Sequence, residues 1–273
     1  MRKNGIVAVG DISNSLISVE VKKKSGLYYH TFIELIGFNP ALAGKIFSGG
    51  VETVEEFKKA LNGKKYRCSL SPHAPYTVSF PLMKMIAEHC RKNSGCLTIH
   101  NQECEDENIF FRNGSGKIAG LLADFSLDLS SFKPDGKNSL PTYINYLNTQ
   151  KIQLAHNTFT SEEDIRYLKN IRDREFYFCL CPRANLYIEG RLPDVQILAK
   201  SDYKITVGTD SLASNHGLSI LDELKVISMQ FPEIPLEELF RWSTINGAEF
   251  LGFDDRLGSI AKGKNPGLNL ITG

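Results

Sequence analysis

The stretch that decides the fold is Lys204-Ile-Thr-Val-Gly-Thr-Asp210-Ser-Leu-Ala-Ser-Asn215, a short apolar run that ends at Gly-Thr and then presents an aspartate. A continuous β-branched run is typical of a strand that is buried on both faces of a parallel sheet. The carboxyl ends of such strands carry the functional residues of α/β barrels. The stretch therefore predicts a parallel strand with Asp210 at its functional end.

Two other strand-like runs end on a histidine. Residues 96–99 lead into His100, with Glu103 three positions further on, and residues 151–155 lead into His156. Parallel strands present their carboxyl ends at one end of a barrel, where two imidazoles and a carboxylate can hold a metal ion. We therefore expect His100, His156 and Asp210 to form a metal site.

Strand and helix patterns alternate along the chain, which is typical of parallel βαβ units. The predicted strands are residues 4–11, 28–36, 66–70, 96–99, 151–155, 175–180 and 204–208, and the predicted helices are residues 52–61, 81–93, 141–148, 160–173, 193–200, 217–229 and 236–251. The expected fold class is α/β, a (β/α)8 barrel of the TIM type. Such a barrel has eight strands, and because the chain opens directly on a strand, we expect the first to be missing.

The composition excludes several function classes. The 273 residues match one barrel domain of about 250 residues. A formal net charge of +1, with 23% charged residues, favours neither a nucleic acid nor a membrane surface as partner, and Lys22-Lys23-Lys24 is interpreted as a solvated turn. No apolar run approaches the roughly 20 residues of a membrane span, and no signal peptide pattern opens the chain.

The six cysteines include no Cys-x-x-Cys pair and lie mostly within strand or helix patterns. In a chain of this length they are typical of reduced core residues, so we expect a cytoplasmic protein. Its expected partner is a small-molecule substrate. Assembly into a homo-oligomer is left open.

Three segments between the predicted strands have distinctive patterns. Two prolines flank His73, which extends that loop and aims the histidine outward. Residues 101–140 are the least regular, which is typical of an insertion that covers a site, and residues 181–186 are predicted as a proline-punctuated loop. Thr160 and Glu163 have the spacing of a helix capping box.

The residue types at the strand ends favour hydrolytic metal chemistry. Imidazoles and a carboxylate suit a divalent metal, zinc first and iron second, and zinc lowers the pKa of bound water to about 7. Hydrolysis at an amidine-like or amide carbon also needs a proton carrier for the leaving nitrogen, and Glu103 is placed for that role. Asp210 is expected to bind the metal and to take the first proton of the water.

Each of these residues also has a purely structural interpretation. A single histidine at a strand end is commonly structural, and an aspartate there commonly caps a helix. The coincidence of three strand ends with Glu103 favours the metal site. We interpret His30 as structural because it lies within its strand, His89 as packed on its helix, and His216 as a surface residue.

Six motifs follow one another along the chain: Gly5-Ile-Val-Ala-Val-Gly-Asp11, Ser71-Pro-His-Ala-Pro-Tyr-Thr77, Ile99-His-Asn-Gln-Glu103, Leu154-Ala-His156, Cys181-Pro-Arg-Ala-Asn-Leu186 and Gly208-Thr-Asp-Ser-Leu-Ala-Ser-Asn215. They resemble the strand motifs of the metal-dependent amidohydrolase superfamily, in its cytosine deaminase-like and S-adenosylhomocysteine or aminodeoxyfutalosine deaminase-like branch. The resemblance covers nearly the whole chain. It implies that His100 and Asp210 are metal ligands, that Glu103 is the proton shuttle and that His156, beside the metal, orients the attacking water and polarises the substrate.

The resemblance also implies a substrate class. His73 would contact the substrate, as in adenosine-type deaminases of this branch, and Arg183 or Asn185 is a further candidate for substrate contact. The implied reaction is hydrolysis of a non-peptide C–N bond, most simply deamination of a purine or of a 5'-substituted adenosine-like nucleoside. Specificity would depend on residues 101–140 and on the proline-rich loops.

The chain departs from the family pattern in one important respect. The family's first strand ends in a His-x-His pair that supplies two ligands, and this sequence has no such pair. We expect residues 1–256 to be barrel strands two to eight and residues 257–273 to be a remnant of the C-terminal β-sandwich. The chain is then a fragment, receives the strand from another chain, or has lost it. A fragment is the first expectation, with weak metal binding as it stands.

Two rival functions remain open on sequence grounds. The chain could be an inactive fragment or a non-catalytic barrel that binds a ligand without turnover, because it lacks the His-x-His ligands. It could also carry another hydrolytic chemistry such as that of a chlorohydrolase, since an activated water attacks any activated ring carbon.

Overall fold

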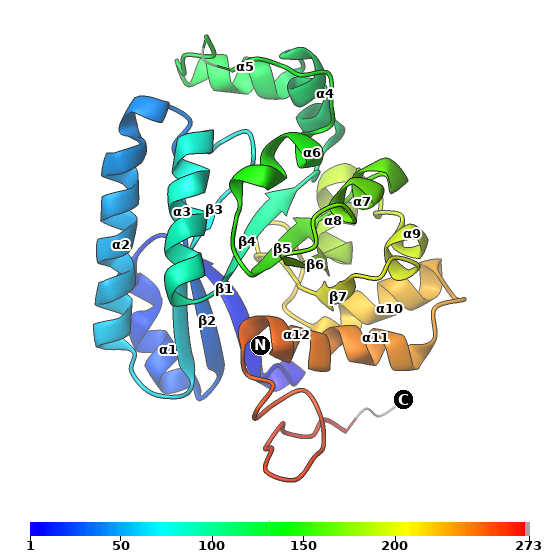
Figure 1. The fold of residues 1–273 in the computed structure, drawn as a ribbon. Coiled ribbons are helices and arrows are strands. Elements are labelled where there is room, and N and C mark those ends of the chain that lie inside the picture. The colour runs from blue at the N-terminus through cyan, green and yellow to red at the C-terminus, as the bar shows by residue number, and fades with distance from the viewer. Residues whose placement is uncertain (131, 271–273) are drawn as a thin grey trace.

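Seven parallel strands form the interior of the molecule (Figure 1). The computed structural model describes residues 1–130 and 132–270. Its strands are β1 (Ala8–Ser13), β2 (Tyr28–Leu35), β3 (Tyr66–Pro72), β4 (Cys96–Asn101), β5 (Lys151–His156), β6 (Glu175–Leu180) and β7 (Lys204–Val207). Each overlaps a strand that the sequence predicts, because buried parallel strands are nearly continuous apolar runs, but β1 begins and ends later than expected.

The strands form two parallel sheets, ordered β1-β2-β3 and β4-β5-β6-β7. β3 and β4 are neighbours, since the amide of His100 donates to the carbonyl of His73 at 2.9 Å. The two sheets face a shared interior, where the ring of Phe250 lies 5.9 Å from that of Phe32 on β2 and 5.2 Å from that of Tyr177 on β6. Within the described residues, no strand pairs with the outer edge of β1 or of β7.

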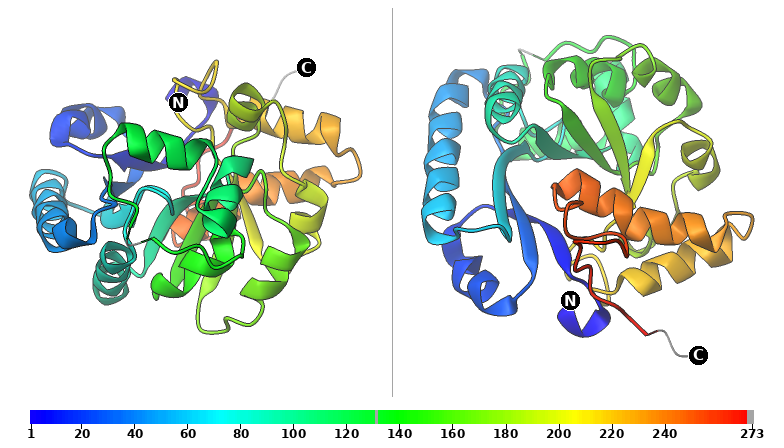
Figure 2. Two further views of the ribbon diagram at one scale, coloured as in Figure 1. Left: turned by 90° about the horizontal axis from the view of Figure 1, so that it is seen from above. Right: turned by 60° about the horizontal axis from the view of Figure 1, so that its bottom comes forward.

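Helices cover the outer faces of the strands (Figures 1 and 2). They are α1 (Val19–Ser25), α2 (Ala43–Ala60), α3 (Phe80–Asn93), α4 (Glu105–Asn113), α5 (Lys117–Asp124), α6 (Ser139–Tyr143), α7 (Glu162–Leu168), α8 (Pro182–Glu189), α9 (Val195–Ala199), α10 (Ile220–Gln230), α11 (Leu236–Ser243) and α12 (Ile245–Leu251). Single 3-10 turns occupy Arg2–Asn4, Leu16–Ser18, Pro40–Leu42 and Ile144–Tyr146. The alternation confirms the α/β class.

Several helical predictions were wrong in type or extent, since α2 begins at Ala43 and not at residue 52, and α7 ends at Leu168 and not at residue 173. The expected loop at 181–186 is the first part of α8, because Pro182 stands in the first helical turn, where its missing N–H costs nothing, and Gly190 ends the helix at φ 65°. The expected helix at 236–251 is divided into α11 and α12 at Thr244, whose φ and ψ of −125° and −83° are not helical.

The segment after β4 is more regular than expected. Residues 101–140 contain α4 and α5, which lie above α3 and α6 in Figure 1. The capping box of α7 was also misplaced by one residue, because Ser161 and Asp164 form it. The Thr160 hydroxyl instead donates to Gln102 Oε1 at 2.7 Å.

Helix α12 is anchored at the amino ends of the strands by basic side chains (Figure 2, right). Lys151 Nζ donates to the carbonyl of Glu249 (3.1 Å), Arg67 to that of Gly252 (2.5 Å), and His30 Nδ1 contacts that of Leu251 (3.2 Å). These are terminal carbonyls that a helix cannot satisfy internally. The interpretation of His30 as structural is confirmed, and burial lowers its pKa to about 4.

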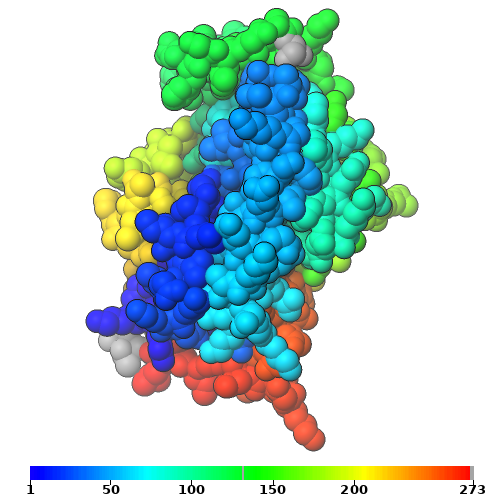
Figure 3. Space-filling view, turned by 90° about the vertical axis from the view of Figure 1, so that its left-hand side faces the viewer, coloured from blue at the N-terminus to red at the C-terminus, as the bar shows by residue number. Residues whose placement is uncertain are grey.

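The interpretation of the three lysines as a solvated turn was wrong. They lie on α1, which lies beside α2 on the face shown in Figure 3, and Lys22 is 3% exposed. Its Nζ lies 2.6 Å from Asp11 Oδ2 and donates to Thr31 Oγ1 at 2.9 Å. The sequence predicted Asp11 at the end of a strand. It lies within β1 instead, and its carboxylate pairs with Lys22 on α1. Burial raises the pKa of Asp11, and Lys22 opposes that rise.

The tail lies beside the start of the chain. Asn269 Nδ2 donates to the carbonyl of Gly5 at 3.0 Å, and residues 257–270 contain no strand. The assignment of 257–273 to a β-sandwich remnant stays a prediction, and its last three residues lie outside the described part of the chain. None of the described helices combines the length and the apolar character that a membrane crossing requires.

We predict that Lys22→Met lowers the free energy of unfolding by about 3–5 kcal/mol, because it leaves the Asp11 carboxylate largely buried without its partner. Lys23→Met is the matched control. Its partner Glu20 is exposed, so the change should be at most about 1 kcal/mol. Urea denaturation of both variants measures the difference. Equal losses from the two substitutions would contradict the buried pair.

Candidate functional site

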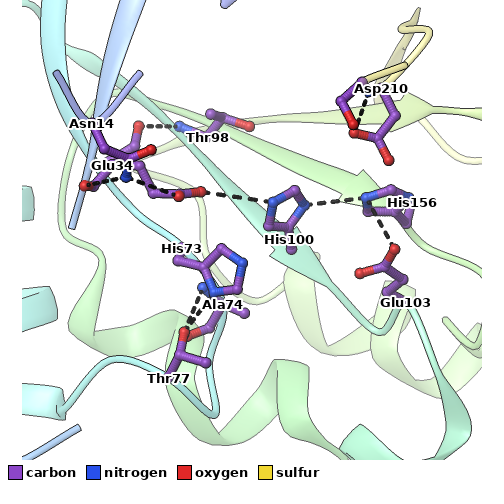
Figure 4. Close-up of polar contacts among 12 residues, drawn as sticks. Asn14, Glu34, His73, Ala74, Thr77, Thr98, His100, Glu103, His156 and Asp210 are labelled. Carbon is purple, nitrogen blue, oxygen red and sulfur yellow. Dashed lines mark hydrogen bonds and ion pairs between the residues drawn. The ribbon is translucent and has the colours of Figure 1, made fainter. Parts of the chain in front are cut away.

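Three histidines and a glutamate converge at the carboxyl ends of the strands (Figure 4). His73 follows β3, His100 and His156 end β4 and β5, and Glu103 follows β4. His156 Nε2 lies 3.1 Å from His100 Nδ1 and 3.5 Å from Glu103 Oε1, while the rings of His73 and His100 lie 5.0 Å apart. The structure thus brings together four of the six residues that the sequence predicted for the site.

The other two predicted residues have different partners. Asp210 accepts hydrogen bonds from the Ser214 hydroxyl and the Ser211 amide, both at 2.6 Å. Arg183 extends its guanidinium from α8 toward Asp222, with Nη1 3.6 Å from Oδ2. In Figure 4 the carboxylate of Asp210 lies on the β7 side of His156.

Two groups of side chains have the donor chemistry of a divalent metal site. Glu34, His73 and His100 form one group, and His100, Glu103 and His156 the other, with ligand atoms within 4.8 Å of one another in each. Both are sets of two imidazoles and one carboxylate, as in catalytic zinc sites and non-haem iron sites. The residues present therefore fit a divalent metal. Asp210 belongs to neither group.

Glu34 is a site residue that the sequence analysis missed. It lies near the carboxyl end of β2, and its Oε1 is 3.8 Å from His100 Nε2. Asn14 Nδ2 donates to its Oε2 at 3.2 Å. A signal was available, because Glu34 is the one charged residue of an aromatic and β-branched strand and lies at the functional end of that strand.

The backbone at His156 is held in the left-handed region. His156 has φ 71° and Asn157 φ 61°, a conformation that is uncommon for residues other than glycine and costs about 1–3 kcal/mol for each residue. Buried amides hold this turn, since Asn157 Nδ2 donates to the carbonyls of Leu154 (2.8 Å) and Cys179 (3.3 Å). The turn directs the His156 ring toward His100.

Asn185 orients the His156 ring. Its Oδ1 lies 3.1 Å from His156 Nδ1, and its Nδ2 donates to the Thr158 hydroxyl at 2.7 Å. Asn185 was a candidate for substrate contact, but it is buried and contacts His156 instead. At His100, burial and then the imidazoles of His156 and His73 hold the pKa well below its usual range, so this ring is neutral.

A buried carboxyl group supports the turn that presents Glu103. Gln102 has φ 45°, and its amide donates to Glu107 Oε1 at 2.9 Å. The Ser139 hydroxyl donates to the same oxygen, while Glu107 Oε2 is buried without a partner. Burial raises the pKa of Glu107 to about 8, so the group is mostly protonated at neutral pH.

Comparison with known proteins agrees with this geometry. The chain matches the Amidohydrolase family over residues 3–273. An adenosine deaminase of Helicobacter pylori is 28% identical over 274 residues, which are 98% of this chain and 64% of that protein. A 5-methylthioadenosine/S-adenosylhomocysteine deaminase of Pyrococcus abyssi is 31% identical over 227 residues, which are 80% of this chain and 48% of that protein.

A solved structure has the same fold. The aminofutalosine deaminase of Helicobacter pylori, in complex with methylthio-coformycin, superposes with a TM-score of 0.80 and 25% identity over 99% of this chain and 67% of that chain. The present chain therefore belongs to the Amidohydrolase family. It spans 64% or less of the length of the two relatives named above.

We predict that Glu107→Gln changes how stability depends on pH. The carboxyl of Glu107 has a pKa of about 8 in the folded chain and near 4.5 when unfolded, so the folded state binds more protons between these values. The free energy of unfolding of the unmodified chain should therefore fall as the pH rises from 4.5 to 8, by on the order of 4 kcal/mol from this group alone.

The glutamine variant lacks this ionisation, so its stability relative to the unmodified chain should rise over the same pH range. Urea denaturation at several pH values measures the two curves. Glu105→Gln serves as the control, because Glu105 is about half exposed on the same helix and pairs with Arg112. Parallel curves for Glu107→Gln and the unmodified chain would show that the group is not protonated in the folded state.

Proposed function

We propose that this chain is the catalytic barrel, or the larger part of it, of a metal-dependent hydrolase that deaminates a purine or a 5'-substituted adenosine-like nucleoside. The observation that carries the proposal is the contact of Glu103, His156 and His100 at the ends of two adjacent parallel strands. The functions of the relatives support the substrate class, because they are deaminases of adenosine and of its 5'-thio derivatives.

A divalent cation held at these strand ends, zinc in the first place and iron in the second, would supply a Lewis acid that makes water nucleophilic at neutral pH. His100 and His156 are the proposed ligands, with Asp210 as the third, in keeping with the sequence. Asp210 would have to release Ser214, to which it is bound at 2.6 Å.

Glu103 is the proposed proton carrier. Its Oε1 lies 3.5 Å from His156 Nε2, and the side chain is 21% exposed, so it reaches both the site and its entrance. It would take a proton from the attacking water and deliver it to the leaving amino nitrogen. A general acid and base of this kind contributes about 10²–10⁴ to the rate.

His73 is the proposed substrate contact. The prolines on either side and its Nδ1 contact with Thr77 Oγ1 at 2.8 Å fix its loop, and its ring faces the ring of His100. Arg183 is the weaker part of this proposal, because its guanidinium is directed to Asp222. Binding of substrate would have to compete with that pair.

The test is ammonia release from adenosine, 5'-methylthioadenosine, S-adenosylhomocysteine and 5'-deoxyadenosine, with zinc or ferrous iron added. We expect release from at least one of these substrates. Glu103→Gln should lower kcat by about 10²–10⁴ with metal content unchanged. The matched control is Glu105→Gln, two residues further on, which should retain activity because its carboxylate pairs with Arg112.

The absence of a His-x-His pair favours the rival proposal that the chain binds a ligand without turnover. The same assay separates the two. Ammonia release that depends on Glu103 supports the hydrolase, whereas saturable binding of a nucleoside with no release under either metal supports the non-catalytic barrel.

A further inference from the structure

A cavity of about 240 Å³ lies at the amino ends of β3, β4 and β5, beside the carboxyl end of α12. His100 and His156 occupy the opposite, carboxyl ends of β4 and β5, so this basal cavity is separate from the histidine cluster. Its volume is far above the roughly 10–15 Å³ that one water molecule requires, so it can receive a small ligand. The proposed function makes no use of this space.

Two cationic side chains line the basal cavity, and no acidic side chain does. The cations are those of Arg67 and Lys151. His30, which also lines the cavity, is neutral, because burial, reinforced by the charge of Arg67, lowers its pKa to about 4. The wall therefore carries two positive charges and no negative one.

Neither charge is neutralised by a carboxylate. Among the residues that the structure describes, Arg67 and Lys151 form no ion pair, and each donates to one backbone carbonyl at the end of α12. Lys151 binds the carbonyl of Glu249, whose carboxylate is itself paired with Lys204. The carboxyl end of a helix carries about half a negative charge, which two full cations exceed. A positive potential therefore remains in the cavity.

The cavity also has the form that concentrates a counter-ion. A guanidinium group has five N–H donors and an ammonium group has three, so most donors of the two cations remain available after these carbonyl contacts. Buried His30, Cys96 and Phe250 close the inner side, whereas Arg67 and Gln150 are exposed at the outer side. A cleft with one sign of charge and low-dielectric walls raises the local concentration of the opposite ion.

We propose that the basal cavity binds a phosphate-type oxyanion between Arg67 and Lys151. The planar fork of an arginine matches two phosphate oxygens, and a lysine supplies a point charge beside it. A phosphate group carries about −1.5 to −2 charges near neutral pH, which two cations balance. The source is inorganic phosphate or the phosphoryl group of a small metabolite, since both present the same oxygens.

A bound oxyanion would join three elements that meet at this end of the molecule. Arg67 lies on β3 and Lys151 on β5, and both also bind the end of α12, which lies across the amino ends of the strands (Figure 2, right). A ligand that binds only the folded chain stabilises it by mass action. Phosphate should therefore raise the midpoint of thermal unfolding through this site.

The test is titration of the chain with inorganic phosphate, followed by the NMR chemical shifts of the amides of Gly95, Cys96 and Gly252, which line the cavity. Chloride keeps the ionic strength constant, so that screening does not change during the titration. We expect saturable shifts at these amides. Lys151→Met should weaken phosphate binding by about 10–100-fold, because it removes a charged hydrogen-bond donor.

Lys65→Met is the matched control. It makes the same change of charge two residues before Arg67, but Lys65 donates to the carbonyl of Gly26 at 3.2 Å and does not line the cavity. Its phosphate affinity should stay within about threefold of the unmodified chain. Arg67→Lys keeps the charge and should still weaken binding, because an ammonium group cannot form the bidentate fork. Thermal unfolding without phosphate confirms that each variant folds.

Ribose 5-phosphate and ribose distinguish the two sources of the oxyanion. Tighter binding of ribose 5-phosphate than of inorganic phosphate, with no binding of ribose, supports the site and identifies a phosphorylated metabolite. The reverse order supports the site and identifies the free ion. Absence of saturable shifts at the three amides, or equal losses from Lys65→Met and Lys151→Met, would overturn the proposal. The two cations would then serve only to cap α12.

Discussion

The left-handed backbone at the ends of β4 and β5 is the constraint on which the site depends. An extended backbone at this position would not direct the His156 ring to the interior. With φ 71°, the ring points toward His100. A strained backbone conformation of this kind persists only where surrounding contacts hold it in place. Here the neighbours are amides: Asn101 Nδ2 donates to Asn157 Oδ1 at 3.0 Å, and Tyr143 donates to Asn101 Oδ1 at 2.8 Å. The polar groups beneath the site are thus part of its geometry.

At the opposite end of the strands, the structural question is how unpaired strand edges are covered. Two strand edges, on β1 and β7, have no partner strand within the described residues, and such edges are ordinarily protected. Helix α12 lies close to both, since Asn246 donates to the carbonyl of Ile205 at 2.8 Å and Leu251 approaches Gly10. A Cβ at Gly10 would lie 2.9 Å from Leu251 Cδ2, so a larger residue at this position would displace the Leu251 side chain. A cavity of about 240 Å³, lined in part by His30 and Arg67, remains beside the α12 terminus.

The strands and the histidine cluster could be predicted from the sequence because both depend on local patterns. A buried parallel strand is an apolar run, and a polar residue directly after it lies at the functional end. The misses depend on partners that lie far away in the sequence. Lys22 looked solvated among three lysines, and only its pairing with Asp11 and Thr31 explains its burial. Glu34 was missed for the same reason, since only its contact with His100 on another strand places it in the site.

The buried amide of Asn185 links α8 to the histidine cluster. Its Oδ1 contacts His156 Nδ1 at 3.1 Å, and His156 in turn contacts His100 and Glu103 through Nε2. Because Asn185 orients the His156 ring, a residue on α8 helps to fix the relative positions of the groups that β4 and β5 bring together. The geometry of the site therefore depends on a side chain from an element that sequence analysis predicted as a loop.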